Sequence, residues 1–291
     1  MHRLPQMAQP GSKVGRLLPR VRRRVARWAA PDLDRELQRT KRQLRATRRK
    51  LRAARADLQK ARQTSSVPAE ALPEAVNDTI RAVTTEGLTY LKAAGLRDLA
   101  AVAVQLERDG VAGAFVEAGT ARGGSAIVIA AAKSAGRPMK VYDVFGMIPP
   151  PTEQDGADVH RRYAKITAGE ARGPGGDTYY GYRDDLYQEV TDAFARHGVP
   201  VADHNIELVQ GLFEDTVRLE EPVAFAHLDG DWYESTMTCL TRIAPLLVPG
   251  GRIVLDDYYM WSGCRKAVDE YFTGRDGFRM EHRTKLHVVR D

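Results

Sequence analysis

Ala226-His-Leu-Asp-Gly-Asp-Trp-Tyr-Glu-Ser-Thr236 and Arg252-Ile-Val-Leu-Asp-Asp-Tyr-Tyr259 each read as a short apolar strand that ends in carboxylates. In an open α/β sheet, ligands bind at the carboxyl ends of the strands. We therefore expect the acidic side chains after these two strands to meet in one small volume. They belong to Asp229, Asp231, Asp256 and Asp257.

Four carboxylates this close repel each other, because like charges about 4 Å apart cost several kcal/mol in a partly buried site. A positive group is expected between them, and a hard divalent cation is the simplest candidate. Mg²⁺, Mn²⁺ or Ca²⁺ fits better than zinc, since no nearby Cys or His pair has zinc-ligand spacing. His227, in the middle of its strand, is expected to be a buried core histidine. The alternative for each aspartate is that it merely caps the next helix.

The rest of the body alternates between strand and helix patterns. Residues 74–106 carry apolar side chains at helical spacing, and the later alternation predicts a doubly wound, mostly parallel α/β sheet. A last pair of strands, separated only by Thr284 and Lys285, predicts a terminal hairpin that adds one antiparallel strand. The strands are predicted at residues 114–119, 140–145, 206–211, 223–228, 252–255, 278–283 and 286–290, and the helices at 123–135, 184–196 and 233–247.

A long segment between the second and third strands interrupts this alternation. Residues 146–182 are too rich in Gly and Pro for a regular element and too long for an ordinary connection. They predict a loop that closes over the cofactor and the acceptor, and a disordered surface segment is the alternative. Its candidate contacts are His160, Arg161, Tyr163 and Tyr179.

Glu117-Ala-Gly-Thr-Ala-Arg-Gly-Gly-Ser125 forms the first strand-to-helix turn, where glycines let the backbone approach a ligand. It lacks both the GxGxxG pattern and a P-loop ending, which disfavours NAD and P-loop chemistry. Asp143 ends the second strand, where doubly wound nucleotide binders place a carboxylate on ribose hydroxyls. Glu117, Asp143 and the missing phosphate cradle describe a site for S-adenosylmethionine, although tight-turn chemistry alone also explains the glycines.

The N-terminal part of the chain is strongly basic. Residues 1–67 contain 20 Lys or Arg and 4 Asp or Glu, a net charge of +16, whereas residues 68–291 contain 24 and 34, a net charge of −10. A long helix is predicted over residues 31–62, and residues 63–73 have the composition of a linker. We therefore expect a basic, helical, coiled-coil-like arm with linker at 1–67 and a catalytic domain at 68–291.

The arm carries a weak heptad repeat. Its leucines recur every seven residues, but the second seam position holds only Thr and Ala. We rank three roles for the arm: formation of a homo-oligomer comes first, binding to an anionic surface second and binding to nucleic acid third. Nucleic acid ranks last because no aromatic residue lies between the arginines. The repeating leucines are Leu37, Leu44, Leu51 and Leu58.

The chain is expected to be cytoplasmic, with peripheral membrane attachment through the arm as an alternative. Cys239 and Cys264 show no CxxC spacing, which argues against a disulfide framework. No apolar run approaches the roughly 20 residues of a transmembrane helix, and the N-terminus lacks the apolar core of a secretion signal.

Several stretches of the body resemble the macrocin O-methyltransferase family. The resemblance covers residues 75–290 and excludes the basic arm. It implies a class I methyltransferase (Rossmann-like) fold and a magnesium-dependent sugar O-methyltransferase that acts on deoxysugars of macrolide and aminocoumarin antibiotics. The stretches are Phe115-Val-Glu-Ala-Gly-Thr-Ala-Arg-Gly-Gly-Ser125, Tyr142-Asp-Val-Phe-Gly-Met147, Leu228-Asp-Gly-Asp-Trp-Tyr-Glu-Ser-Thr236 and Asp256-Asp-Tyr-Tyr-Met-Trp-Ser-Gly-Cys-Arg265.

The resemblance also implies roles for individual residues. Glu117 and Ser125 would lie near the methionine end of S-adenosylmethionine, Asp143 on its ribose, and Gln210 and Gly211 near its adenine. Gly119 and Thr120 complete the expected cofactor-binding set. Asp229, Asp256 and Asp257 would hold Mg²⁺ or Mn²⁺, and Asp231 would be the general base.

We therefore expect a metal-dependent O-methyltransferase that modifies a sugar hydroxyl on a glycosylated natural product or glycan. Two vicinal hydroxyls that chelate a cation lose a proton more readily, as metal-bound water does. A catechol-type O-methyltransferase would use the same chemistry and is the enzymatic alternative. The non-enzymatic alternative is a scaffold protein that acts through its basic arm.

Overall fold

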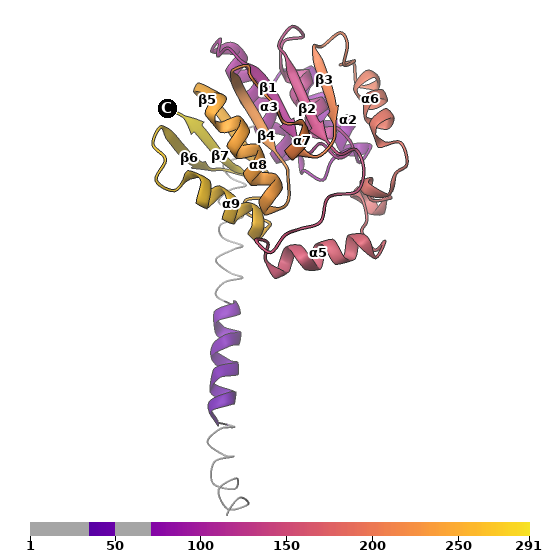
Figure 1. Ribbon diagram of the computed structural model, residues 1–291. Helices are drawn as coiled ribbons and strands as arrows, with labels where there is room; N and C mark the ends of the chain where they lie inside the picture. The colour runs from indigo at the N-terminus through magenta and orange to yellow at the C-terminus, as the bar shows by residue number, and fades with distance from the viewer. Residues whose placement is uncertain (1–34, 50–70) are drawn as a thin grey trace, which may run out of the picture. The chain divides into compact units, whose positions relative to one another are not determined.

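Seven strands form a single sheet in a computed structural model that describes residues 35–49 and 71–291 (Figure 1). Their order is β3-β2-β1-β4-β5-β7-β6. β1 to β5 run parallel, while β7 is antiparallel to both of its neighbours. The predicted doubly wound sheet with one antiparallel strand is confirmed. The strands are β1 (Ala114–Ala118), β2 (Met139–Asp143), β3 (Ile206–Gln210), β4 (Val223–Leu228), β5 (Leu247–Leu255), β6 (Phe278–His282) and β7 (Leu286–Arg290).

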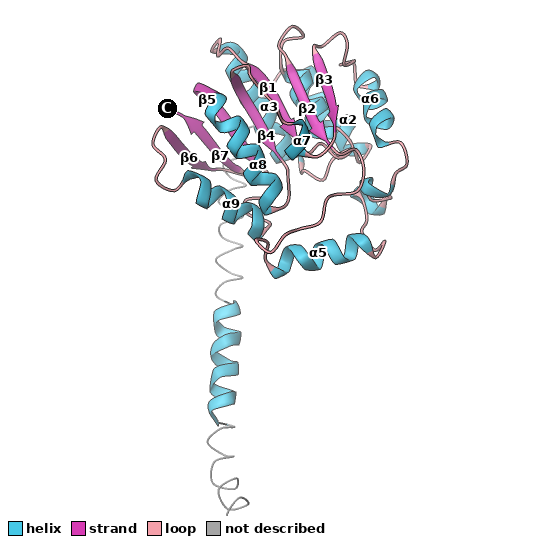
Figure 2. Ribbon diagram, in the orientation of Figure 1, coloured by secondary structure: helices cyan, strands magenta, loops and turns pink. Residues whose placement is uncertain are grey.

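Helices cover both faces of this sheet (Figure 2). One apolar core lies between the sheet and a first group of helices, and a second core lies under the other group. The first group is α2 (Glu74–Thr85), α3 (Ala93–Arg108), α4 (Gly124–Ala132) and α6 (Leu186–Arg196); the second is α7 (Phe213–Thr216), α8 (Tyr233–Ile243) and α9 (Ser262–Phe272). The helical pattern over residues 74–106 is thus two helices, because the chain turns at Gly87, whose φ of 66° favours glycine.

The segment between β2 and α6 has more regular structure than its composition predicts. α5 (Ala157–Thr167) lies within it, followed by the short helices η3 (Pro174–Gly176) and η4 (Tyr180–Tyr182). α5 forms because Val159 and Ile166, two turns apart, bury their side chains on one face. The prediction of an irregular loop over residues 146–182 was therefore wrong for this part.

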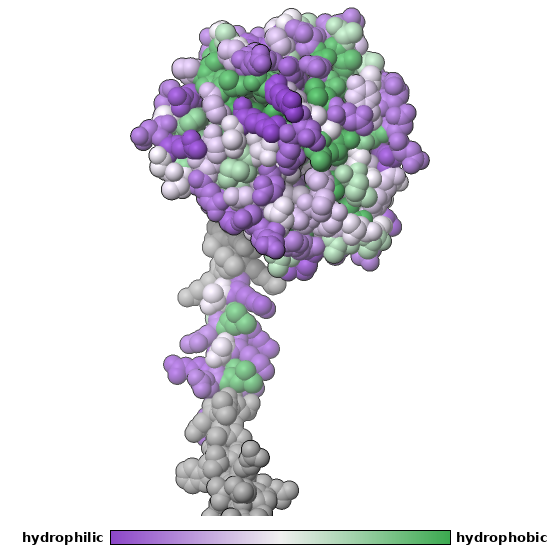
Figure 3. All heavy atoms as spheres, viewed as in Figure 1, coloured by the Kyte–Doolittle hydropathy of each residue, from purple (hydrophilic) through white to green (hydrophobic). Residues whose placement is uncertain are grey.

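In the basic arm, residues 35–49 are helical, as the sequence predicts. Leu37 and Leu44 are about half exposed, and Figure 3 shows apolar spots on the otherwise hydrophilic surface of this helix. Leu51, Leu58 and the predicted boundary at residues 67–68 lie outside the described residues, so the coiled coil and the two-domain division stay predictions. Across 35–49 and 71–291, no helix has the length and apolar character needed to cross a membrane.

Candidate active site

The parallel sheet brings the predicted aspartates together at its carboxyl edge. Leu228, the last residue of β4, lies opposite Ala118 of β1 on one side and Leu255 of β5 on the other. The residues that follow these strands are therefore neighbours, at the point where the strand order reverses between β1 and β4. One carboxylate oxygen from each of Asp229, Asp256 and Asp257 lies within 4.8 Å of the other two.

Asp231 stands beside this cluster in a strained backbone conformation. Its φ of 55° is uncommon for a residue other than glycine and is typical of functional sites. The conformation is held in place because the Asp231 N–H donates to Asp257 Oδ2 at 3.0 Å. Asp231 is one of the residues that line the cleft at this edge of the sheet.

Burial and like charge raise the pKa values of three of these aspartates. Burial, followed by repulsion from Asp256 and Asp257, holds the pKa of Asp229 well above its usual range. Burial and the Asp257 carboxylate do the same to the pKa of Asp231. Burial and the Asp256 charge raise the pKa of Asp257 to about 6. Burial and mutual repulsion thus both oppose ionisation of these carboxylates, and a nearby positive charge would favour it.

A lysine reaches into the cluster, which the sequence interpretation did not anticipate. Lys285 Nζ lies 2.6 Å from Asp256 Oδ2 and donates to the Asp256 carbonyl oxygen at 3.0 Å. It arrives there because Leu286, the first residue of β7, pairs with Leu255 at the end of β5. The positive group expected between the aspartates is thus partly a side chain of the protein, which corrects the expectation of a divalent cation alone.

His227 is a fully buried core histidine, as predicted. Its Nδ1 lies 3.2 Å from Glu117 Oε2 and its Nε2 lies 3.6 Å from Asp256 Oδ1, contacts of ion-pair length rather than aligned hydrogen bonds. Burial opposes a charge on the ring, but the two carboxylates outweigh it and raise the pKa of His227 to about 9. Burial likewise opposes ionisation of Asp256, yet Lys285 and His227 together lower the pKa of that carboxyl below its usual range.

The glycine-rich turn after β1 lies against the acidic cluster. Gly119 has a φ of 87°, and a Cβ at this position would overlap the carbonyl oxygen of Asp229. The turn is held from β2: Asp143 Oδ2 accepts the N–H groups of Thr120 and Ala121 at 2.8 and 3.0 Å, and its Oδ1 accepts the Phe145 N–H at 2.7 Å. Asp143 therefore shapes the turn as well as facing the cleft.

A cleft opens over this edge of the sheet, and four of the predicted site residues line it: Gly119, Asp143, Asp229 and Asp231. Glu117 lies behind the cleft, fully buried, where it accepts the Ser125 hydroxyl at 2.5 Å. Gln210 and Gly211 do not line the cleft, but the three residues after them do. The remaining lining residues are Val144, Ile148, Pro149, Tyr180, Leu212, Phe213, Glu214, Gly230 and Ser235.

The predicted contacts in residues 146–182 divide into two groups. Tyr179 is buried in a small apolar cluster with Trp232, whose indole N–H donates to the Pro149 carbonyl at 2.9 Å. These two rings pack the segment onto the sheet. Tyr163, on α5, is partly buried and packs against the same cluster. His160 and Arg161 are exposed on α5. Tyr180, which lines the cleft, was missed because no pattern in the sequence distinguishes it from the adjacent Tyr179.

Comparisons with known proteins agree with this architecture. Residues 31–277 match the family described as Macrocin-O-methyltransferase (TylF). The match begins inside the basic arm, which corrects the expectation that the resemblance excludes residues 1–67. The 8-demethyl-8-(2,3-dimethoxy-alpha-L-rhamnosyl)-tetracenomycin-C 4'-O-methyltransferase of Streptomyces olivaceus is 34% identical over 175 residues, which make up 58% of this chain and 61% of that protein. The mycinamicin III 3''-O-methyltransferase of Micromonospora griseorubida is 32% identical over 173 residues, 56% of this chain and 62% of that protein. The chain thus spans less than two thirds of the length of these relatives.

Solved structures share the fold. The O-methyltransferase NovP superposes with a TM-score of 0.57 and 24% identity, covering 72% of this chain and 87% of that one. The calicheamicin methyltransferase CalS11 superposes with a TM-score of 0.52 and 18% identity, covering 75% and 91%. The fold is therefore a methyltransferase fold, and since the family match extends over most of its length, the chain belongs to the macrocin O-methyltransferase family.

Proposed function

We propose that this protein is a metal-dependent, S-adenosylmethionine-dependent O-methyltransferase that modifies a sugar hydroxyl of a glycosylated natural product. The observation that carries the proposal is the group of carboxylates from Asp229, Asp256 and Asp257 beside the strained Asp231. Membership of the family supports it, as do the two relatives, whose names describe methylation of a glycosylated tetracenomycin and of mycinamicin III.

The cleft suits the proposed cofactor. Gly119 leaves room for a ligand at the end of β1, and Asp143 offers a carboxylate edge beside the cleft. S-adenosylmethionine, when bound, supplies an electrophilic methyl group. We propose that Gly119, Thr120 and Asp143 contact it directly, with Gln210 and Gly211 at the adenine end. Glu117 and Ser125, hydrogen-bonded to each other behind the turn, hold the methionine end of the site in shape.

The donor set also fits a hard divalent cation. Carboxylate oxygens are the ligands that Mg²⁺ and Mn²⁺ prefer, and Asp256 Oδ1 is buried without a hydrogen-bond partner. Burial, together with the charge of neighbouring carboxylates, raises the pKa values of Asp229 and Asp257, and a bound cation would offset the repulsion. When bound by these three aspartates, the cation would lower the pKa of a coordinated sugar hydroxyl.

Asp231 is the proposed proton acceptor. The hydrogen bond from its backbone N–H to Asp257 holds the main chain of Asp231 beside the three aspartates. A carboxylate held within hydrogen-bond range of the hydroxyl takes its proton as the oxygen attacks the methyl group in line. Burial and the Asp257 charge raise the pKa of Asp231, and a cation held by the neighbouring aspartates would lower it and so favour the ionised form.

The test is the Asp231→Asn variant. Asparagine keeps the shape but cannot accept the proton, so kcat should fall by about 10²–10⁴-fold with cofactor affinity unchanged. Methyl transfer from labelled donor to panels of glycosides and catechols, with and without EDTA, measures the rate, and calorimetry measures cofactor binding. Glu234→Gln, an exposed carboxylate three residues away, is the matched control.

Each measurement in this assay can contradict the proposal. Near-normal turnover of Asp231→Asn removes Asp231 from the mechanism. Turnover that survives EDTA removes the cation, and transfer to catechols but not to sugars replaces the proposed acceptor.

A further inference from the structure

Lys285 is the feature of the site that the proposed mechanism does not use. It is the last residue of the three-residue turn between β6 and β7, and its side chain is only 18% exposed. Its ammonium group holds Asp256 twice, through Oδ2 at 2.6 Å and through the carbonyl oxygen at 3.0 Å. The other carboxylate oxygen of Asp256, Oδ1, lies 3.6 Å from His227 Nε2.

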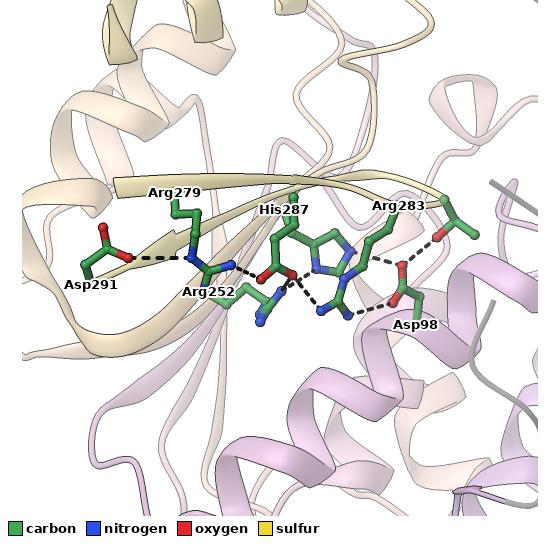
Figure 4. A network of polar contacts seen from close by, with 8 residues as sticks. Asp98, Arg252, Arg279, Arg283, His287 and Asp291 are labelled. Carbon is green, nitrogen blue, oxygen red and sulfur yellow. Dashed lines mark hydrogen bonds and ion pairs between the residues drawn. The ribbon is translucent and has the colours of Figure 1, made fainter. Parts of the chain in front are cut away.

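The turn that carries Lys285 is anchored by a separate buried network on α3. Asp98 Oδ2 accepts the Thr284 hydroxyl at 2.5 Å and contacts His287 Nε2 at 3.0 Å, and Arg283 Nη1 lies 3.6 Å from Asp98 Oδ1. Figure 4 shows Asp98, Arg283 and His287 converging at this end of the hairpin. These contacts fix the backbone on both sides of Lys285, and its own two contacts with Asp256 place the ammonium group at the acidic cluster.

Lys285 also lies outside the part of the chain that matches the family, which ends at residue 277. Its position is set by the terminal hairpin, which places Lys285 directly before β7. A fixed ammonium group beside three carboxylates has two physical effects. It stabilises the ion-free cluster, and it repels a divalent cation that approaches the same oxygens.

We propose that Lys285 is a positioning residue: an internal counter-ion that holds Asp256 and competes with a divalent cation for its carboxylate. The inference rests on the proposed function, because it assigns the cation to Asp229, Asp256 and Asp257. Lys285 keeps the three carboxylates together while no cation is bound, and it sets the cation concentration at which the site fills. A weaker cation affinity follows directly from the retained positive charge.

The experiment measures Mn²⁺ binding to the full chain by electron paramagnetic resonance, without cofactor or acceptor. Lys285→Met keeps the side-chain length but removes the charge, so Mn²⁺ should bind about tenfold more tightly or better. Lys285→Arg retains the charge and should bind like the wild type. Lys140→Met is the matched control, because Lys140 also pairs with a carboxylate, that of Glu221 at 3.1 Å, but on β2 away from the cluster.

The outcomes separate this inference from the proposed function. Unchanged or weaker binding in folded Lys285→Met overturns the inference and leaves the metal-dependent methyltransferase standing. Failure of both wild type and Lys285→Met to bind Mn²⁺ overturns the inference together with the metal dependence. If Lys285→Met does not fold, the ammonium NMR signal of Lys285 in the wild type decides: it should shift as Mg²⁺ is added, and a constant signal with Mg²⁺ bound contradicts the competition.

Discussion

At the scale of single residues, Gly119 shows how tightly the cofactor turn and the acidic cluster are joined. Its backbone combines a φ of 87° with a direct approach to the Asp229 carbonyl group. A side chain there has to push β1 and β4 apart at their carboxyl ends. The Gly119 position therefore couples the geometry of the proposed cofactor site to that of the proposed metal site.

Gly119→Ala should lower the free energy of unfolding by about 1–3 kcal/mol, since overpacking a fixed backbone forces shifts of that cost. It should also weaken S-adenosylmethionine binding measured by calorimetry. Urea unfolding measures the stability. Gly136→Ala is the control, because a Cβ at Gly136 meets no heavy atom within 4 Å. Equal behaviour of the two variants contradicts the assigned role of Gly119.

At the scale of elements, the β6–β7 hairpin extends the sheet beyond β5 to its edge. A chain of charged groups runs along it, in which Arg252 donates to Glu281 at 2.6 Å and contacts His287 Nδ1 at 3.3 Å (Figure 4). Because Nδ1 faces the guanidinium donors of Arg252, it acts as an acceptor, and the His287 ring is neutral. Burial lowers the pKa of His287 in agreement with this, despite the nearby Asp98.

Asp98 makes the stability of this hairpin depend on pH. Burial opposes its ionisation, but the hydrogen bond from His287 and the charge of Arg283 prevail, and its pKa lies below the usual range. A depressed folded-state pKa gives stability that is present above the unfolded pKa of about 3.9 and lost as the pH falls through the folded value. The hairpin should therefore weaken in acid.

Asp98→Asn should lower the free energy of unfolding by about 3 kcal/mol at pH 7, because Arg283 and the buried His287 then lose the carboxylate that they face. Denaturant unfolding from pH 7 to pH 3 measures the difference between wild type and variant, which should shrink toward the acid end. Asp109→Asn, at the end of α3 with a side chain 47% exposed, is the control and should change little. A difference that does not vary with pH refutes the assignment.

At the scale of the whole molecule, the role of the basic arm can be tested separately from the activity of the body. The described helix of the arm exposes Leu37 and Leu44 on one heptad column. If these leucines pair two copies of the chain, replacing them with charged residues should abolish the pairing and leave the body of the protein unchanged.

Leu37→Glu combined with Leu44→Glu should convert an oligomer into a monomer, measured as solution mass by light scattering, with methyl transfer per chain retained. Thr40→Glu, between these positions in the sequence, serves as a milder comparison on the second seam column. An oligomer of unchanged mass removes the arm from the interface.

The local pattern was sufficient for much of this protein. Strand periodicity predicted β4 to the residue, and the parallel sheet then required Asp229 and Asp257 to meet, because the carboxyl ends of neighbouring parallel strands share one edge. The terminal hairpin followed from two short strands with two residues between them. α5 was missed because Gly and Pro around it concealed a short amphipathic segment.

The electrostatic environment of the site depended on contacts between residues far apart in the chain. Lys285 contacts Asp256 because of the register of β7 against β5. Glu117 contacts His227 because the pairing of β1 with β4 places the two residues opposite each other. Residue type and spacing specify which groups lie at the edge of a sheet, since backbone periodicity is local. The partner of each charge depends on packing across strands, which no short stretch of sequence encodes.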